Sequence, residues 1–296
     1  GTRVTSAWRA VRRATWPDQQ VLVAKLREAA ERAEEAGWEP PSLPIVGEVV
    51  RSVGLSTAMK AAGVVTGILP IPQPMLLVGP GSSKRLGQAL AGFGHRRLLI
   101  VTDRVVVELG LLKGLTQALK KGGADFVVFD AITADAPIPV LEKGIAFYGR
   151  RGCDAIVAFG GGSAMDAAKV IGYAAANRKH PRKLVGYFKG LASPPPLYAV
   201  PTTAGTGSEV ARGAIIVLDD GRKLGFHSWH LVPKAAICDP DLTIGLPPRL
   251  TAATGMDAVA HCIETYLSRA INPPADAIAF DGLRRAAAHL ERAVND

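Results

Sequence analysis

Short apolar runs alternate with helical stretches through the middle of the sequence, and this alternation restricts the fold more than any other feature. The runs LLIVTD (98–103) and DFVVFD (125–130) end in an acid, as buried parallel strands do where they meet a loop, and DAIVAFG (154–160) ends in glycine. Helical stretches at 105–121 and 139–152 separate the three runs. The repetition predicts βαβ units with right-handed crossovers, and therefore an α/β fold built on a parallel sheet.

The alternation of strand-like and helical patterns stops on either side of this region, which predicts three segments. An N-terminal extension is expected to be helical, because 18–38 has helical periodicity and 46–65 has a weaker helical pattern. At the other end, Ala-rich helices at 251–270 and 275–294 follow one another without a strand between them. The predicted segments are the helical extension, the α/β dinucleotide-binding domain and the start of a helical metal-binding domain, at residues 1–70, 71–241 and 242–296.

Composition and charge exclude several classes of protein. With 48% hydrophobic and 21% charged residues, the 296-residue chain has the composition of a folded globular protein. The net charge of +9 comes from Lys and Arg scattered in ones and twos, so nucleic acid is not expected as a partner. The apolar run GVVTGILPIP (63–72) is broken by Pro and Gly and is shorter than the ~18 residues of a membrane helix, so no membrane partner is expected.

Cysteine usage indicates the compartment. Cys153, Cys238 and Cys262 lie in separate apolar runs, with no CxxC pair among them. Such isolated cysteines are typical of reduced core thiols, which predicts a cytoplasmic location.

Three consecutive glycines, Gly160, Gly161 and Gly162, lie between the predicted strand at 154–160 and the helical stretch that follows it. Glycines at such a junction let the backbone approach a bulky anion, while the amides and dipole of the helix N-terminus attract it. Ser163 can cap the helix or bind a phosphate, and Asp166 and Lys169 follow within two turns. The spacing is not GxGxxG. We expect a pyrophosphate site here, and the alternative is a tight turn that binds nothing.

Hydroxyl and carboxylate side chains follow two other predicted strands. Asp103 closes LLIVTD, where an acid can accept a hydrogen bond from a ribose hydroxyl and disfavour the 2′-phosphate of NADP, although it can equally cap a helix. After the strand in PPPLYAVP, the loop PTTAGTGSE carries the hydroxyls of Thr202, Thr203 and Thr206, and its glycines allow close approach to a ligand. NAD is therefore the expected cofactor, with NADP as the alternative.

One acid and one histidine lie on the first C-terminal helix. Asp257 and His261 are spaced i, i+4, which places both on one helix face, where an oxygen and a nitrogen can share a divalent metal. A buried histidine that is hydrogen-bonded within its helix explains the pair as well. Two ligands are also too few for a catalytic metal.

The sequence resembles the iron-dependent (group III) alcohol dehydrogenase family in six motifs, which occur in the family's order over roughly residues 75–296. The motifs are VGPGSSKRLG, LLIVTD, FGGGSAMDAAK, VPTTAGTGSE, ICDPDLTIGLPPRLTAATGMDAVAHCIETYLS and NPPADAIAFDGL. The resemblance implies a dehydroquinate-synthase-like fold, in which a Rossmann-like α/β domain precedes an all-helical domain and the active site lies between them. It implies hydride transfer between a nicotinamide and a small alcohol or aldehyde, with Fe(II) or, alternatively, Zn(II) polarising the substrate oxygen in a homodimeric enzyme.

Residue roles follow from the same resemblance. Gly160, Gly161, Gly162 and Ser163 would hold the pyrophosphate, and Asp103 would face the adenine ribose. Thr202 and Thr203 would line the cofactor cleft, with Lys169 beside it. Asp257 and His261 would be the first two metal ligands. Because the chemistry would centre on the metal, no separate catalytic side chain is assigned.

The sequence departs from the family pattern at the metal site. The family takes two further histidine ligands from later helices, and none of His227, His230 and His289 matches either position. We therefore expect half a metal site, and bare apolar surface on the two C-terminal helices. The alternative function is a fragment or remnant that binds the cofactor without turnover.

Overall fold

The computed structural model describes residues 72–134, 136–218, 222–268 and 272–296, together with the backbone of three strands nearer the N-terminus. The chain divides into two compact units. The larger unit comprises residues 71–260 and 284–296, and the smaller comprises 1–70 and 261–283.

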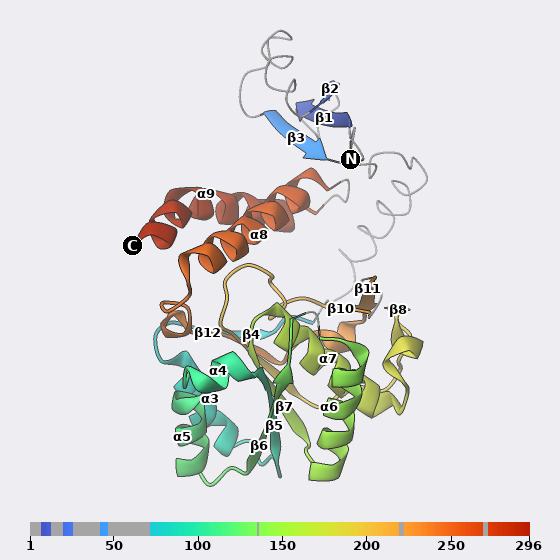
Figure 1. The fold of residues 1–296 in the computed structure, drawn as a ribbon, viewed down its shortest axis with the longest axis vertical. Coiled ribbons are helices and arrows are strands. Elements are labelled where there is room, and N and C mark those ends of the chain that lie inside the picture. The colour runs from blue at the N-terminus through green and yellow to red at the C-terminus, as the bar shows by residue number, and fades with distance from the viewer. Residues whose placement is uncertain are drawn as a thin grey trace, which may run out of the picture. The chain divides into compact units, whose positions relative to one another are not determined.

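A six-stranded sheet, parallel throughout, is the centre of the larger unit (Figure 1). From one edge to the other its strands are β4 (Met75–Val78), β12 (Ala235–Cys238), β9 (Leu197–Pro201), β7 (Ala155–Gly160), β5 (Leu98–Asp103) and β6 (Phe126–Ile132). The α/β class predicted from the alternating pattern is confirmed.

Helices cover both faces of this sheet, as Figure 1 shows for α3 and α5 on one side and α6 and α7 on the other. The helices are α3 (Ser82–Ala91), α4 (Arg104–Glu108), α5 (Lys113–Lys121), α6 (Ile138–Arg151) and α7 (Gly162–Asn177). Successive residues of a strand enter different cores: Ile156 packs on the α6–α7 side and Val157 on the α3–α5 side. Both faces of each central strand are therefore apolar, which explains the continuous apolar runs in the sequence.

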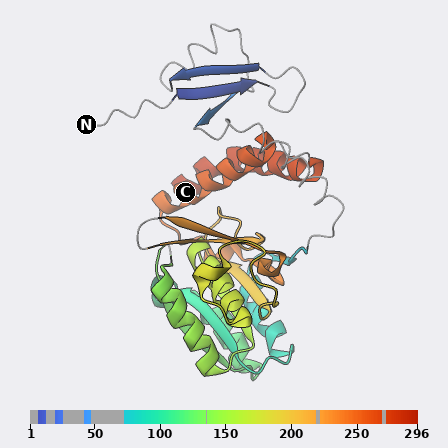
Figure 2. The same cartoon turned by 90° about the vertical axis from the view of Figure 1, so that its right-hand side faces the viewer.

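A small second sheet was not predicted. Strands β10 (Gly213–Val217) and β11 (Lys223–His227) pair in antiparallel fashion, and β8 (Gly186–Tyr187) pairs in parallel with β11. The hairpin appears in Figure 2 as two orange-brown arrows. Short 3-10 helices complete the connections, at η3 (Pro181–Leu184), η4 (Trp229–Leu231) and η5 (Pro240–Leu242).

Two long helices follow the α/β region, as predicted. They are α8 (Pro248–Leu267) and α9 (Pro273–Asn295). The Leu290 side chain occupies the place that a Cβ on Gly255 would take, so the two helices approach closely there. Among the described side chains, α8 has no buried residue and α9 has Ala279 alone. The expected bare apolar surface stays a prediction.

The N-terminal segment differs from the predicted helical extension. β1 (Ala7–Arg12), β2 (Gln20–Lys25) and β3 (Ser42–Val46) form an antiparallel sheet in the order β2-β1-β3. The helix predicted over 18–38 is therefore wrong at β2. The run QVLVAK contains two β-branched valines, and so short a run fits a strand as well as a helix. The remainder of that helix, and most of the one predicted over 46–65, lie outside the described residues.

All three cysteines are free thiols, as predicted. Cys153 is buried, but Cys238 and Cys262 are partly exposed, so only the first is a core thiol. Within the described part of the chain, no helix is both long enough and apolar enough to cross a membrane.

Candidate cofactor site

The three predicted glycines form the turn between β7 and α7. Gly160 ends β7 at φ 149°, a conformation that favours glycine, and a Cβ there would lie 2.8 Å from that of Ala164. Gly161 is the N-cap of α7, which begins at Gly162. Among the described residues, no side chain accepts a hydrogen bond from the amide of Gly161 or Gly162. A 16-residue helix therefore directs uncapped amides and the positive end of its dipole to one point, which suits a bound anion.

The hydroxyl-rich loop after β9 packs against this turn. The Thr202 amide donates to the Gly160 carbonyl at 3.0 Å, and the Thr202 side chain is buried. A Cβ on Gly161 would lie 3.6 Å from Thr203 Oγ1, and a Cβ on Gly162 only 2.7 Å from Thr206 Cγ2. The structure thus brings the predicted glycines and threonines together. It also shows that Gly162 is needed for the approach of the loop, because a Cβ there would overlap Thr206, whereas a Cβ on Gly161 would make an ordinary contact with Thr203.

Lys169 is buried, and Asp166 partly buried, under the far end of the same loop. Lys169 Nζ donates to three carbonyls, those of Ser208 at 2.6 Å, Ala211 at 2.9 Å and Gly213 at 2.8 Å. Asp166 accepts from Ser208 Oγ at 2.5 Å and from the Ile215 amide at 2.8 Å. The prediction that both residues contact the cofactor is not tested by these bonds, but all three Lys169 protons are engaged within the protein.

Burial shifts the pKa of both groups toward the neutral form. For Lys169, desolvation lowers the pKa to about 8, and the charges of Asp166 and Glu209 oppose this shift. For Asp166, desolvation raises the pKa, against the influence of Lys169 and of the hydrogen bonds from Ser208 and Ile215.

Asp103 fills one of the two roles that the sequence left open, that of a helix cap. Its Oδ1 accepts from the Val106 amide at 2.9 Å and so caps α4. Its Oδ2 lies 3.4 Å from the place of a Cβ on Gly160, at the edge of the glycine turn. The cap is therefore present, and contact with a ribose remains a prediction.

The sequence did not predict the role of a second glycine turn, at Gly81 before α3. The Asp239 carboxylate, just after β12, accepts from the Gly81 amide at 3.0 Å, the Ser83 amide at 2.9 Å and Ser83 Oγ at 2.6 Å. Burial raises the pKa of Asp239, but these bonds and one from the Asp241 amide hold it below its usual value. An acid directly after a strand was the available signal, yet its partners lie more than 150 residues away.

The predicted metal donors, Asp257 and His261, lie one turn apart on α8. In the described ranges, no group of three or more His, Cys, Asp and Glu side chains is arranged to hold a metal. Catalytic sites for zinc use three protein ligands, so these two donors alone do not make a complete metal site.

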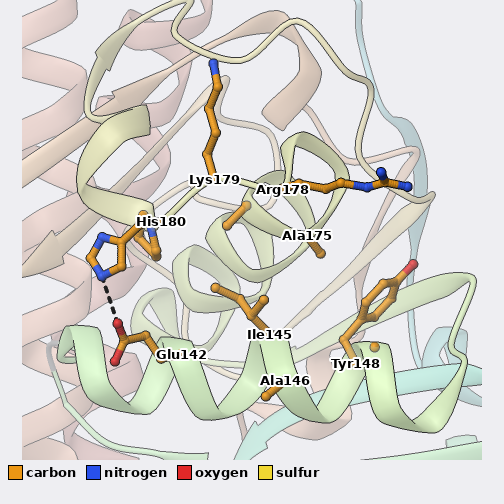
Figure 3. Close-up of a pocket in the computed structure, with 11 residues that line it drawn as sticks. Glu142, Ile145, Ala146, Tyr148, Ala175, Arg178, Lys179 and His180 are labelled. Atoms are coloured by element: carbon orange, nitrogen blue, oxygen red, sulfur yellow. Dashed lines mark hydrogen bonds and ion pairs between the residues drawn. The ribbon is translucent and has the colours of Figure 1, made fainter.

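A cavity of about 510 Å³ lies elsewhere, between α6 and the C-terminal end of α7 (Figure 3). Ile145 contributes to its apolar lining, Arg178 and Lys179 are basic, and His180 Nε2 lies 2.7 Å from Glu142 Oε1. None of the predicted cofactor or metal residues lines this cavity, so it is separate from the predicted site.

The sheet and its helices define an α/β protein with a Rossmann-like sheet, and comparison with known proteins identifies its family. The sequence pattern described as iron-containing alcohol dehydrogenase matches residues 73–240, and that of the Fe-containing alcohol dehydrogenase C-terminal domain matches 251–296. The chain belongs to the iron-containing alcohol dehydrogenase family, as the resemblance predicted.

Individual relatives agree with this assignment. 4-Hydroxybutyrate dehydrogenase of Cupriavidus necator is 54% identical over 69% of this chain and 54% of its own. 1,3-Propanediol dehydrogenase of Klebsiella pneumoniae is 36% identical over 73% of this chain and 57% of its own. The chain therefore spans little more than half the length of these relatives.

Solved structures show the same fold. The structure of 1,3-propanediol oxidoreductase aligns with a TM-score of 0.73 at 34% identity, covering 77% of this chain and 60% of the other. Sulfoacetaldehyde reductase of Bifidobacterium kashiwanohense, solved in complex with NAD+, aligns with a TM-score of 0.71 at 28% identity, covering 77% of this chain and 61% of its own.

Proposed function

We propose that this chain binds NAD at the β7–α7 turn and serves in hydride transfer between the nicotinamide and a small alcohol or aldehyde. One observation carries the proposal. The amides of Gly161 and Gly162 meet no side-chain acceptor in the described part of the chain, and they lie at the N-terminus of a long buried helix. A pyrophosphate would supply the missing acceptors.

The remaining cofactor contacts follow from the same geometry. Asp103 Oδ2 is near enough to the turn to accept from the adenine ribose, and its charge would oppose a 2′-phosphate, which favours NAD over NADP. Thr203 and Thr206 border the glycines and offer hydroxyls to the phosphates or the nicotinamide ribose. Oxidation would move a hydride from the alcohol carbon to NAD+ and release the hydroxyl proton, giving the aldehyde and NADH.

The substrate class is proposed from the relatives. The relatives named 4-hydroxybutyrate dehydrogenase and 1,3-propanediol dehydrogenase support a short primary alcohol that carries a second polar group at its other end. The 54% identity to the former makes an ω-hydroxy acid the first substrate to test.

Metal dependence is also part of the proposal. The family name and the spacing of Asp257 and His261 support Fe(II), with Zn(II) as the alternative. Because these donors alone do not complete a metal site, a second candidate function remains, namely NAD binding without turnover.

We further propose a cytoplasmic homodimer. The free thiols support the location, and light scattering would test the oligomeric state.

One titration separates these functions. NADH fluorescence is recorded as protein is added, with and without Fe(II), and oxidation of 4-hydroxybutyrate is then followed in the same cuvette. Binding with Fe(II)-dependent turnover supports the dehydrogenase, and His261→Ala should abolish turnover while leaving the Kd for NADH unchanged. Binding without turnover supports the second candidate. Failure to bind NADH contradicts both.

A further inference from the structure

Lys169 is an unusual lysine, because it is almost fully buried (2% exposed) and donates only to main-chain carbonyls. All three acceptors belong to the segment that runs from Ser208, near the end of the hydroxyl loop, to Gly213, the first residue of β10. An ammonium group has three protons, so this set of acceptors satisfies it completely. Lys169 therefore has no proton left for a ligand in this arrangement.

Asp166 holds the same segment at two further points. It lies three residues before Lys169 on α7, on the same helix face. Its carboxylate accepts from Ser208 Oγ at the start of the segment and from the Ile215 amide within β10. Two side chains of α7 thus bind the main chain or hydroxyl of the segment at five points between Ser208 and Ile215.

This attachment extends to the threonines that border the glycine turn. The Ser208 amide donates to Thr206 Oγ1 at 3.2 Å, and the Thr206 side chain lies against Gly162. The chain of contacts therefore runs from Lys169 through Ser208 to Thr206 and the glycine turn. A displacement of Ser208 would move the hydroxyls that face the proposed pyrophosphate.

We propose that Lys169 and Asp166 are positioning residues for the cofactor, which hold the hydroxyl loop against the glycine turn instead of contacting the cofactor themselves. This inference rests on the proposed function, which supplies NAD as the ligand. The attachment of the loop to α7 can be tested without any ligand. In this proposal, the two polar residues that follow Ser163 in FGGGSAMDAAK bind the loop that faces the glycines.

The charge of Lys169 should matter to this attachment. A neutral amine would turn a lone pair toward one of three carbonyls and break at least one bond. The charged groups that act on it are Asp166 on α7 and Glu209 in the loop, and the His227 ring of β11 borders Gly213 on the other side. With a pKa near 8, Lys169 would lose its proton in mildly alkaline solution, where NADH has no group that titrates.

The first test compares Lys169→Met with Ile171→Ala. The methionine keeps most of the buried stem and removes all three donors. Ile171 is buried on the same helix but contacts the α6 side, where its Cδ1 fills the place of a Cβ on Gly144. We expect Lys169→Met to raise the Kd for NADH by about tenfold or more, and Ile171→Ala to change it by less than about threefold at a comparable loss of thermal stability.

Amide hydrogen exchange tests the attachment without any ligand. Residues 202–215 should exchange faster in Lys169→Met than in the wild type, and they should remain protected in Ile171→Ala. If Lys169→Met does not fold, Ser208→Ala serves in its place, because it removes only the hydroxyl bond to Asp166. Unchanged exchange in the folded variant would overturn the proposal, whether or not NADH binds.

The pH profile compares the wild type with Lys169→Met. The Kd for NADH should rise between about pH 7 and about pH 9.5, and this rise should be absent in Lys169→Met. A flat wild-type profile, or an equal rise in both proteins, would overturn the role of the Lys169 charge. A wild type that does not bind NADH at any pH would contradict the proposed function instead, and the exchange experiment would still decide whether the loop is held.

Discussion

Two glycine turns begin helices in this molecule, and they differ in what the helix amides meet. Before α3, the amides of Gly81 and Ser83 are bound by the Asp239 carboxylate, an anion that the protein itself supplies. Before α7, the amides of Gly161 and Gly162 meet no side-chain acceptor among the described residues. We call the turn at Gly81 the closed turn, because a carboxylate of the protein occupies its amides, and the turn at Gly161 and Gly162 the open turn, because its amides can meet a ligand. Both turns contain glycines followed by serine. A glycine-rich strand–helix junction therefore suits an anion only where the fold leaves its amides without an acceptor.

The largest effect is expected for Gly162→Val in the open turn. A Cβ there would lie 2.7 Å from Thr206 Cγ2, and the valine methyls would cover the amides that the pyrophosphate needs. We expect the Kd for NADH to rise by about a thousandfold, measured by fluorescence. Gly81→Ala is the matched control in the closed turn: at φ 69° it should cost about 1 kcal/mol of stability without changing the Kd. Equal losses of affinity in both variants would remove the distinction between the turns.

Asp239→Ala should have the converse effect, because it frees the Ser83 amide of the closed turn and leaves Asp241 Oδ2 as the side-chain acceptor of the Gly81 amide. It removes a buried carboxylate that accepts from two amides and a hydroxyl at the start of α3, so we expect the free energy of unfolding to fall by about 2–4 kcal/mol, measured in urea. The Kd for NADH should change by less than about threefold. Tighter binding of NADH after this change would indicate that the closed turn is a latent cofactor site.

The same carboxylate gives a pH dependence with a defined sign. The pKa of Asp239 is lower in the folded state, so the unfolded state binds more protons in the acid window and this stabilisation is lost as the pH falls below about 4. The difference in unfolding free energy between the wild type and Asp239→Asn should therefore shrink from neutral pH toward about pH 3. A difference that stays constant with pH would contradict the assignment of a charged cap.

A smaller effect is expected for Asp103→Asn, beside the open turn. Asparagine can still cap α4 through its carbonyl oxygen, but it carries no charge to oppose a 2′-phosphate. The ratio of the Kd for NADPH to that for NADH should fall by about tenfold. If the ratio does not move, Asp103 acts only as a helix cap.

The smallest effect is expected for Thr206→Val, which keeps the shape of the side chain. It removes the acceptor of the Ser208 amide and one hydroxyl at the open turn, so the Kd for NADH should rise by about two- to fivefold. Thr116→Val is the control, because the Thr116 hydroxyl donates only to the Leu112 and Lys113 carbonyls at the start of α5, and its loss should leave the Kd unchanged. A larger effect than that of Gly162→Val would contradict the importance of the bare backbone.

The sequence predicted the open turn better than the closed one for a physical reason. β5, β7 and α7 are long, regular and apolar on the faces that pack, so their pattern in the sequence is strong. The glycine turn lies between two such elements and could be placed from local information. The Asp239 cap joins residues more than 150 positions apart, and no local pattern reveals such a partner.

Other differences have similar causes. Lys169 was placed near the cofactor by its position in a motif, but the direction of its side chain depends on the loop at 208–213, which follows a different strand. The β10–β11 hairpin was missed, although GAIIVLDDGRKLGF contains an acidic Asp–Asp–Gly sequence between two apolar runs, which is typical of a hairpin. At β2, a short run with valines fitted both periodicities, and strand pairing decided between them.

The most direct test of the two turns is a titration of the 15N-labelled protein with NADH, in which backbone amide chemical shifts are recorded. We predict that the resonances of Gly161 and Gly162 move most, while those of Gly81 and Ser83 stay in place because Asp239 already holds them. Large shifts at Gly81 and Ser83, with none at Gly161 and Gly162, would contradict the assignment of the β7–α7 turn as the cofactor site.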